Sequence, residues 1–307
     1  MIGLVRAAAI CVTLALGLVQ AQAADKAFKR DDLADAAIKL EAQIKSEAGP
    51  VSKSAATLRT DADVAFRRND FRSGLQILGQ IVAAAPEDSG NWLRLARSIL
   101  QIKPSTTSEQ TFFLERASTA AFVAYMRATN PQDEADALAV LGRALSERKL
   151  WRPALDALRL SLDLREVADV RARVLQARVH RADVFVLGSP DYHGGISGTL
   201  KNFLDHFWHE FAGKLFATVV ASHEKGLTVT DQLRTIARQC YAWTLPYGVA
   251  FTEDIDVKDG QIASEGLKKR LEMIVRDARV YGQLLARQRR ADLAGIEPGF
   301  LARHRKK

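Results

Sequence analysis

A loop rich in glycine carries the residue types of this sequence that are best suited to hold a ligand. It spans residues 189–198, between the apolar run 184–187 and a helix-like segment that begins at Gly198. A buried parallel strand that ends in a Pro/Gly loop and continues as a helix is where open α/β sheets bind cofactors. The pattern therefore predicts a ligand site in this loop.

Two other interpretations of the loop remain open. In the first, Pro190 only stops the strand and Ser197 or Gly198 only starts a helix, which is ordinary turn and capping chemistry. In the second, nearby histidines bind a metal, but no carboxylate falls at a ligand spacing from them, so surface histidines are favoured. We predict no metal site and assign no catalytic residue. The histidines in question are His193, His206, His209 and His223.

The elements that position the loop alternate between strands and helices from about Ala172 onward. Such alternation implies right-handed crossovers and a parallel sheet. Tyr241, Trp243 and Tyr247 are predicted to pack in its core. The pattern predicts strands at 184–187, 215–221 and 246–251 and helices at 198–211, 228–243 and 264–289.

The preceding part of the chain, residues 25–165, is helical in pattern and contains no convincing strand. Small and aromatic residues recur where two antiparallel helices would interlock, first at 62–86 and again at 137–158, with a weaker copy at 92–131. Their spacing matches a tetratricopeptide unit. Three stacked hairpins of this kind would form a small solenoid, because a single repeat cannot bury its apolar faces.

The first residues form a predicted signal peptide, residues 1–23. Arg6 supplies the positive region, residues 7–18 the apolar stretch, and Ala21 and Ala23 the small residues before cleavage. Cleavage would remove Cys11 and leave Cys240 as the single cysteine, which excludes an internal disulfide. The apolar stretch is too short for an ordinary spanning helix. We therefore expect a soluble periplasmic protein.

The net charge of +8 and the isoelectric point near 9.6 raise the question of an anionic partner. The lysines and arginines are scattered along helical faces without interleaved aromatic residues, so we expect no nucleic-acid partner. No other segment is apolar and long enough to cross a bilayer. The dense basic cluster at 303–307 is interpreted as part of a solvated tail, residues 291–307.

The segment 190–205, which reads PDYHGGISGTLKNFLD, resembles the flavin-edge segment of the NADPH-dependent FMN reductase family, part of the flavodoxin-like superfamily. The resemblance covers about residues 174–307. It implies FMN and NAD(P)H as cofactors, with main-chain N–H groups of the loop facing the flavin ring. A second family loop follows the next strand, and here residues 222–226 contain less glycine than is usual. Carried over position by position, the cofactor-binding residues are Pro190, Asp191, Tyr192, His193, Gly194, Gly195 and Ser222.

The part of this fold that holds the FMN phosphate is missing from the sequence. Phosphate is normally held by a Ser/Thr/Gly-rich loop after the first strand, at a helix N-terminus. No apolar strand with such a loop occurs upstream of Asp183. Because flavodoxin-like sheets have the order 2-1-3-4-5, this loss also exposes the edge of the strand at 184–187. An exposed apolar edge favours pairing with another chain, so a homo-oligomer through this edge is expected.

The helical part also resembles a known family. The signal peptide, residues 24–30, the turn at 66–71 and the segment 151–158 resemble the N-terminal helical region of exported bacterial alpha-macroglobulin proteins, up to about Arg173. No Cys-Gly-Glu-Gln thioester motif occurs. The resemblance implies only a helical recognition or spacer module, with a protein or peptide partner on its repeats.

Together these patterns predict an α plus α/β chain. Tetratricopeptide-like hairpins (24–170) are followed by a partial flavodoxin-like domain with a three-stranded parallel sheet and flanking helices (174–290). The predicted function is that of an NAD(P)H-dependent FMN reductase-like domain, inactive if the missing phosphate loop is essential. The alternative is a periplasmic helical-repeat interaction module. A fusion near residues 173–178 accounts for both halves, and if the signal belongs to a fusion artefact the location is cytoplasmic.

Overall fold

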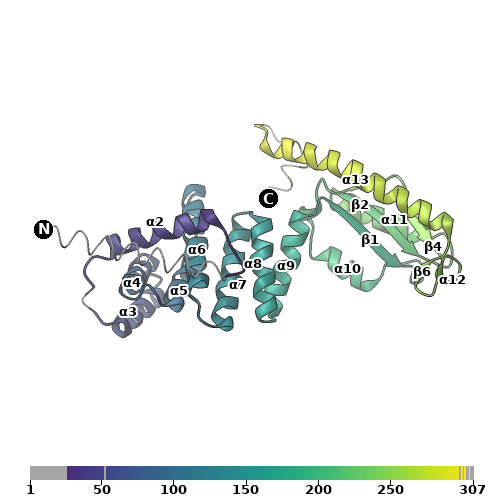
Figure 1. The fold of residues 1–307 in the computed structure, drawn as a ribbon. Coiled ribbons are helices and arrows are strands. Elements are labelled where there is room, and N and C mark those ends of the chain that lie inside the picture. The colour runs from purple at the N-terminus through teal and green to yellow at the C-terminus, as the bar shows by residue number, and fades with distance from the viewer. Residues whose placement is uncertain (1–25, 52, 297–298, 300, 302–303, 305–307) are drawn as a thin grey trace. The chain divides into compact units, whose positions relative to one another are not determined.

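The computed structural model describes residues 26–51, 53–296, 299, 301 and 304, and the chain divides into two compact units (Figure 1). The first unit is Met1–Arg178 and the second is Val179–Lys307. The predicted signal peptide, with Cys11, and much of the predicted basic tail lie outside the described residues. Within these residues no helix combines the length and apolar character needed to cross a membrane.

The described part of the first unit is built from helices, as the sequence predicts. Five of them begin at an N-cap residue whose side chain accepts a hydrogen bond from a backbone N–H in the first turn. These N-cap residues are Ser54, Asp70, Asp88, Thr106 and Asn130. The helices are α2 Asp31–Ala48, α3 Ala55–Arg67, α4 Phe71–Ala84, α5 Ser89–Ile99, α6 Thr107–Arg127, α7 Pro131–Glu147, α8 Trp151–Leu164 and α9 Ala168–Arg181.

Consecutive helices pack against each other as pairs, α3 with α4 and α7 with α8. Both pairs turn through one left-handed residue, Asn69 (φ 58°) and Lys149 (φ 61°). Each pair also has a glycine where the helices meet. A Cβ on Gly142 would lie 2.5 Å from Leu158 Cγ, and one on Gly74 would lie 2.7 Å from the Phe66 ring. The same turn and the same small-residue contact therefore occur twice, while the tetratricopeptide assignment itself stays a prediction.

The second unit contains a parallel sheet with β2 (Leu215–Ala221) in the middle. On one side, β1 (Val184–Pro190) pairs with β2 along its whole length, from Val184 opposite Leu215 to Pro190 opposite Ala221. On the other side, two short strands share the β2 edge: β3 (Trp243–Thr244) pairs with its start and β4 (Val249–Phe251) with its end. The predicted partial parallel sheet is confirmed, but two short strands, β3 and β4, take the place of a single third strand.

Helices cover both faces of this sheet (Figure 1). On one face, α11 (Leu227–Gln239) and α10 (Gly198–Asp205) pack on a core that includes Leu187, Phe216 and Leu233. On the other face, α13 (Glu265–Ala294) buries Ile274 and Ala278 against Leu215 and Ala217. The remaining elements are the 3₁₀ helix η1 His209–Phe211, the helix α12 Glu253–Asp256 and the strands β5 Val257–Lys258 and β6 Gln261–Ile262.

Several predicted boundaries are wrong. The helix predicted at 228–243 ends at Gln239, because Tyr241 adopts a left-handed conformation (φ 54°) and Trp243 enters β3. Trp243 is 50% exposed and Tyr241 36%, so neither is a core residue. The helix predicted at 198–211 stops at Asp205. The antiparallel pair β5–β6 turns through Asp259 and Gly260, both at positive φ. This Asp-Gly hairpin was not among the predicted elements, although Asp-Gly is a strong hairpin signal.

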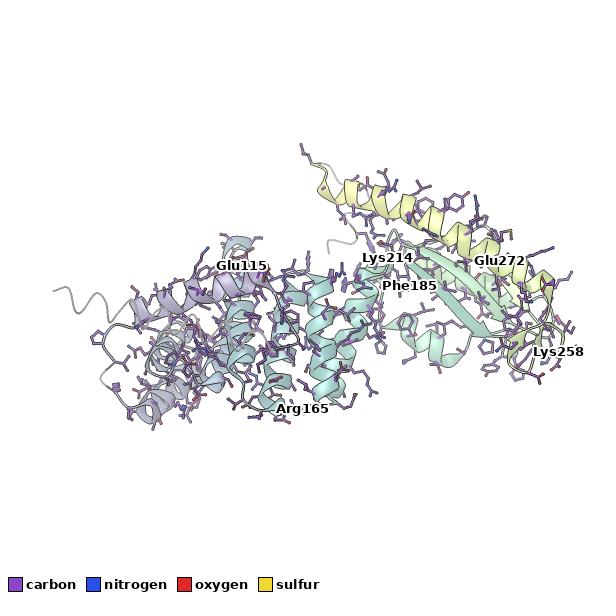
Figure 2. All side chains as sticks on the ribbon, in the orientation of Figure 1. Glu115, Arg165, Phe185, Lys214, Lys258 and Glu272 are labelled. Atoms are coloured by element: carbon purple, nitrogen blue, oxygen red, sulfur yellow. The ribbon has the colours of Figure 1, made fainter. Side chains whose placement is uncertain are left out.

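A buried lysine connects the start of β2 to the end of α9. Lys214 is fully buried, and its Nζ donates to the carbonyl oxygens of Val179 and His180, the latter at 3.1 Å. These carbonyls belong to the last turn of α9, where no following helical turn supplies an N–H group to bond them. The ammonium also lies 5.5 Å from the centre of the Phe185 ring (Figure 2). Lys214 therefore caps the helix that leads into β1.

The outer edge of β1 is open in the described part of the chain. Leu215 N–H bonds to Asp183 O and Asp191 N–H bonds to Ala221 O, so the odd-numbered residues of β1 bond to β2. The N–H groups of Val184, Val186 and Gly188 then point away from the sheet. Val186 is 64% exposed. This is the edge that the sequence predicts; its pairing with another chain stays a prediction.

Candidate functional site

The predicted ligand loop lies at the carboxyl ends of β1 and β2, where open α/β sheets bind cofactors. The N–H of Asp191 continues the β1–β2 ladder by donating to Ala221 O at 2.8 Å. The N–H of Ser222 extends the ladder on the other side of β2, to Phe251 O at 2.9 Å. The two segments carried over from the family, 190–195 and the one that begins at Ser222, therefore come together at one edge of the sheet.

Asp191 ties these two segments to each other. Its Oδ1 accepts the N–H of Gly194 at 2.7 Å, and its Oδ2 accepts the hydroxyl of Ser222 at 3.0 Å. The first bond closes a turn of the loop between Asp191 and Gly194. His193 (φ 55°) and Gly194 (φ 79°) take left-handed conformations inside that turn. Asp191 is thus an organiser of the loop, with both carboxylate oxygens in use.

Tyr192 and Gly195 form a closed pair at the tip of the loop, each donating its N–H to the other's carbonyl at 3.0 Å. This pairing turns the tyrosine side chain outward, where it is 64% exposed. An exposed aromatic ring on a rigid turn can pack against a flat ligand without first leaving a core.

Gln232 of α11 holds the loop from the side, and sequence reasoning missed it. Its Oε1 accepts the N–H of Ile196 at 3.1 Å, and its Nε2 donates to Gly194 O at 2.9 Å. One amide side chain thus satisfies a donor and an acceptor of the loop backbone. A glutamine 36 residues beyond Ile196 on a helix carries no local motif, so only the fold reveals the contact.

Two serines fix the start of α10. Ser189 Oγ accepts the N–H of Ser197 at 2.9 Å, and Ser197 Oγ accepts the N–H of Leu200 at 3.3 Å. Ser197 is therefore the N-cap of this helix. Ordinary capping chemistry and the ligand-loop pattern occur in the same segment.

Most backbone donors of the loop are used within the protein. From Asp191 to Ser197, six of the seven N–H groups donate to protein acceptors, and His193 is the exception in the described structure. A flavin at this site would meet a preformed surface of exposed tyrosine and glycine backbone. The residues present fit contact with the ring.

The phosphate-binding loop that this fold normally has after its first strand has no counterpart among the described residues upstream of β1. Upstream of β1, residues 26–51 and 53–181 form helices and the turns between them, with no strand that ends in a phosphate-binding loop. The fit is therefore to the flavin ring and not to its phosphate. The assignment of individual cofactor-binding residues stays a prediction.

The four histidines of the metal interpretation do not gather. His193 is in the loop, His206 ends α10, and His209 Nδ1 lies 3.1 Å from Nε2 of His304, with Trp208 stacked on the His209 ring. No group of three or more His, Cys, Asp or Glu residues able to hold a metal ion occurs among the described residues.

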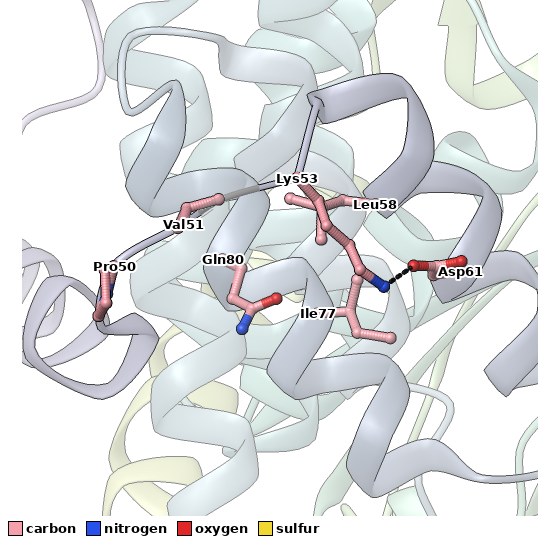
Figure 3. Close-up of a pocket in the computed structure, with 7 residues that line it drawn as sticks. All are labelled: Pro50, Val51, Lys53, Leu58, Asp61, Ile77 and Gln80. Carbon is pink, nitrogen blue, oxygen red and sulfur yellow. Dashed lines mark hydrogen bonds and ion pairs between the residues drawn. The ribbon is translucent and has the colours of Figure 1, made fainter.

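The first unit has a cavity of its own, of about 220 Å³ (Figure 3). Leu58, Ile77 and Val51 supply its apolar wall, and Lys53 Nζ bonds to Asp61 Oδ2 at 2.8 Å beside it. The pair is solvent-exposed. The cavity is too small for a flavin, because sites that bury a drug-sized ligand measure about 300–1,000 Å³.

Comparison with known proteins assigns part of the chain to a family. Residues 152–256 match the family model of NADPH-dependent FMN reductase. The match begins inside α8 and ends at the last residue of α12, so it includes the loop and both segments that Asp191 joins. These residues thus carry the sequence of an NADPH-dependent FMN reductase family domain, which confirms the family of the C-terminal resemblance, although the matched range begins and ends earlier than the predicted 174–307. The alpha-macroglobulin resemblance stays a prediction.

Individual relatives share this region. The chain is 34% identical over 111 residues to an FMN-dependent NADPH-azoreductase of Staphylococcus saprophyticus, covering 34% of this chain and 58% of that protein. It is 29% identical over 139 residues to an NADPH azoreductase of Bacillus sp., covering 44% and 77%. It is 35% identical over 109 residues to an NADH-dependent FMN reductase of Pseudomonas fluorescens, covering 34% and 57%. The chain thus spans little more than half the length of two of these relatives.

Proposed function

We propose that the second unit binds the isoalloxazine ring of a flavin, with FMN as the natural form, and supports NAD(P)H-dependent reduction. The observation that carries the proposal is the loop at the carboxyl edge of the sheet, in which Asp191 joins Gly194 to Ser222. It lies within the residues that match the FMN reductase family. Of the relatives named above, the Staphylococcus saprophyticus protein is FMN-dependent and the Pseudomonas fluorescens protein reduces FMN, and all three use NADPH or NADH.

In this proposal the protein supplies the surface for the ring. Tyr192 packs against it, and the backbone of 193–195 approaches its edge, where glycine allows close contact. Bound flavin supplies the hydride chemistry, and the protein supplies binding and orientation. We assign no acid or base residue.

We further propose that FMN is held weakly. Each charge-assisted hydrogen bond to a phosphate is worth about 1.5–3 kcal/mol, so the loss of several lowers affinity by orders of magnitude. Weak retention of the cofactor would leave the purified chain nearly inactive unless FMN is added.

Titration of FMN with the purified chain, followed by quenching of flavin fluorescence, tests the proposal. We expect saturable quenching that Tyr192→Ala weakens at least several-fold. Phe112→Ala is the matched control, because Phe112 is also an exposed aromatic residue (51%) but belongs to α6 of the first unit. Absence of quenching at any FMN concentration would reject flavin binding.

A second candidate function belongs to the first unit. We propose that the predicted signal peptide exports the chain to the periplasm, where the helical hairpins bind a protein or peptide. Repeat geometry permits this use without specifying the partner. A pull-down from periplasmic extract with the mature chain should recover a specific partner, and the same bait with Lys53→Glu at the exposed rim of the cavity should lose it if the cavity takes part. Fractionation that finds the chain only in the cytoplasm would contradict export.

A further inference from the structure

We propose that the open edge of β1, together with the bare face beside it, accepts a strand, a loop and a helix from a second polypeptide. In the flavodoxin-like order 2-1-3-4-5, β1 corresponds to strand 3, so the added strand takes the place of strand 1. The loop that follows the added strand holds the FMN phosphate. This last step rests on the proposed flavin function, whereas the docking rests on the sheet alone.

The outer edge of β1 can pair with another parallel strand. The N–H and C=O groups of Val184, Val186 and Gly188 point to this side, because the alternate residues of β1 bond to β2. No strand among the described residues pairs there. The seven residues of β1 carry no charge, and charged side chains are a common device against edge pairing. The edge thus presents the donors and acceptors of these three residues to an apolar strand.

One face of β1 is bare beyond its first residue. On the face that α10 and α11 cover, Leu187 is buried. On the α13 face, Gly282 packs directly against Val184, but Val186 is 64% exposed and a Cβ on Gly188 would meet nothing within 4 Å. The strands of parallel sheets are normally covered on both faces. The α13 side of β1 therefore has room for one more helix.

Helix α13 borders this bare face with an apolar side chain. Val275 is 63% exposed and lies seven residues before Gly282, so it projects from the same flank of the helix, two turns away. Because Arg289 near the end of α13 bonds to Asp183 just before β1, the helix runs antiparallel to the strand, and Val275 lies toward the carboxyl end of β1. We call Val275 and the bare face of β1 from Val186 onward the shelf. An amphipathic helix on the shelf would bury both valines.

The handedness of crossover connections also predicts a helix at the shelf. The connection from β1 to β2 runs through α10, on the face opposite α13. Connections between parallel strands are right-handed, so a connection that crosses the sheet in the opposite direction lies on the opposite face. The step from strand 1 to strand 2 leads away from β2, and its helix therefore belongs on the α13 side. Topology and exposed side chains thus point to the same place.

A strand added in this way delivers its loop to the ligand site. Parallel strands end at the same edge of a sheet, so the added strand ends beside Pro190, where the ligand loop begins. The helix that follows then begins at this edge, and the N–H groups of a helix N-terminus suit a phosphate. A Ser/Thr/Gly-rich loop at that point supplies what the described residues upstream of β1 lack.

A second copy of this chain does not meet these requirements. Two copies related by a twofold axis would pair β1 with β1 in antiparallel fashion, which places their ligand loops at opposite ends of the paired strands. Neither copy has a phosphate loop among its described residues upstream of β1. The surface is therefore committed to a different polypeptide, with an apolar strand, a Ser/Thr/Gly-rich loop and an amphipathic helix.

Co-expression of the full chain with a tagged fragment tests the docking. The fragments are the first halves of the Staphylococcus saprophyticus and Pseudomonas fluorescens relatives, which by the flavodoxin-like order contain strands 1 and 2. We expect a one-to-one complex with at least one fragment, measured by light scattering. Val186→Lys and Val275→Lys should each lower its recovery by about tenfold, because a charge on the shelf would be buried without a partner. Ile262→Lys is the matched control, since Ile262 is exposed (39%) but belongs to β6, outside this sheet.

Titration with FMN and with riboflavin, which has no phosphate, tests the phosphate step by quenching of flavin fluorescence. The complex should bind FMN at least about 100-fold more tightly than the chain alone, through several new charge-assisted hydrogen bonds. The affinity for riboflavin should change little. An equal gain for both flavins would overturn the phosphate step.

The failures of the docking and of the proposed function give different results. If neither fragment purifies with the chain, the docking is overturned even when the chain alone binds FMN. If a complex forms but neither it nor the chain binds a flavin, the proposed function and the phosphate step both fall. Capture that Val186→Lys leaves at the parent level would also overturn the proposal. A parent dimer that Val186→Lys dissociates, without capture of a fragment, would assign the edge to a second copy instead.

Discussion

Asp191 is the single side chain on which the geometry of the ligand loop depends most. It accepts one hydrogen bond from within the loop that follows β1 and one from the segment that follows β2, so its two oxygens bond to segments that follow two different strands. Such a residue couples the shape of the loop to the position of Ser222. Its part in the proposed ring binding is therefore indirect, through the conformation of Tyr192 and Gly194.

Replacement of Asp191 by alanine should lower the free energy of unfolding by about 1–2 kcal/mol, because the Gly194 N–H and the Ser222 hydroxyl lose their acceptor. Asp191→Asn should retain most of that stability, since its amide can still accept from one group and donate to the other. Urea denaturation of both variants measures the difference. Equal stability of the alanine variant and the parent would contradict the assigned role.

Tyr247 should make stability depend on pH at the alkaline end. Partial burial and the hydrogen bond to Asp277 raise the pKa of Tyr247 from 10.0 to about 12. A folded-state pKa above the unfolded value means that this contribution is complete below pH 10 and is lost as the pH rises toward 12. The urea midpoint of the parent should therefore fall across this window more steeply than that of Tyr247→Phe. If the urea midpoints of the parent and of Tyr247→Phe fall in parallel, Tyr247 contributes nothing to the pH dependence of stability.

The helices pack by means of glycine at places where no other residue fits. Gly142 of α7 lies against Leu158 and Ala154 of α8, and an added Cβ would come within 3.2 Å of the Ala154 carbonyl oxygen. Gly79 of α4 is also inside a helix, but an added Cβ would meet nothing within 4 Å. The two positions look alike in the sequence and differ only in what lies opposite them.

The same substitution should consequently have opposite effects at these two positions. Gly142→Ala should lower stability by about 1–3 kcal/mol through overpacking. Gly79→Ala should raise it by about 0.5–1 kcal/mol, because alanine is the better helix former and has room. Thermal and urea denaturation of the two variants give the sign directly. Destabilisation by both would contradict the open space beside Gly79.

Much of this architecture could be predicted from the sequence because its apolar patterns are strong. Strands were predicted correctly at 184–187 and at 215–221, because both segments are short, almost entirely apolar and bounded by turn residues, a pattern typical of buried strands. The third strand was harder. It is interrupted at 245–248, where Gly248 packs directly against Thr218, a contact between distant residues that no local pattern reveals. Gln232 was missed for the same reason.

Helix α9 determines how far the first unit extends, because it supplies the last layer of that unit's core. Val170, Val174 and Ala177 are buried together with Leu155 and Leu158 of α8. The unit boundary falls after Arg178, so this cluster belongs entirely to the first unit. The helical unit therefore needs α9 even though the same helix leads directly into β1.

Fragments of the first unit should show this dependence. A chain of residues 26–178 should be more stable than one of residues 26–165 by about 3–5 kcal/mol, the value of burying two valines and covering two leucines. Circular dichroism during urea titration compares the two. A fragment ending at Arg165 that is as stable as the longer one would show that α9 adds nothing to the core.

The open edge of β1 has a consequence for the chain before it reaches its native state. Its seven residues carry no charge, so no lysine or glutamate discourages an encounter with a neighbour that is still folding. The rate of such encounters grows with the square of the chain concentration, whereas the rate of folding within single chains grows only in proportion to it. Renaturation should thus succeed in dilute solution and give precipitate when concentrated, and a single lysine at position 186 should act as a gatekeeper that restores the yield.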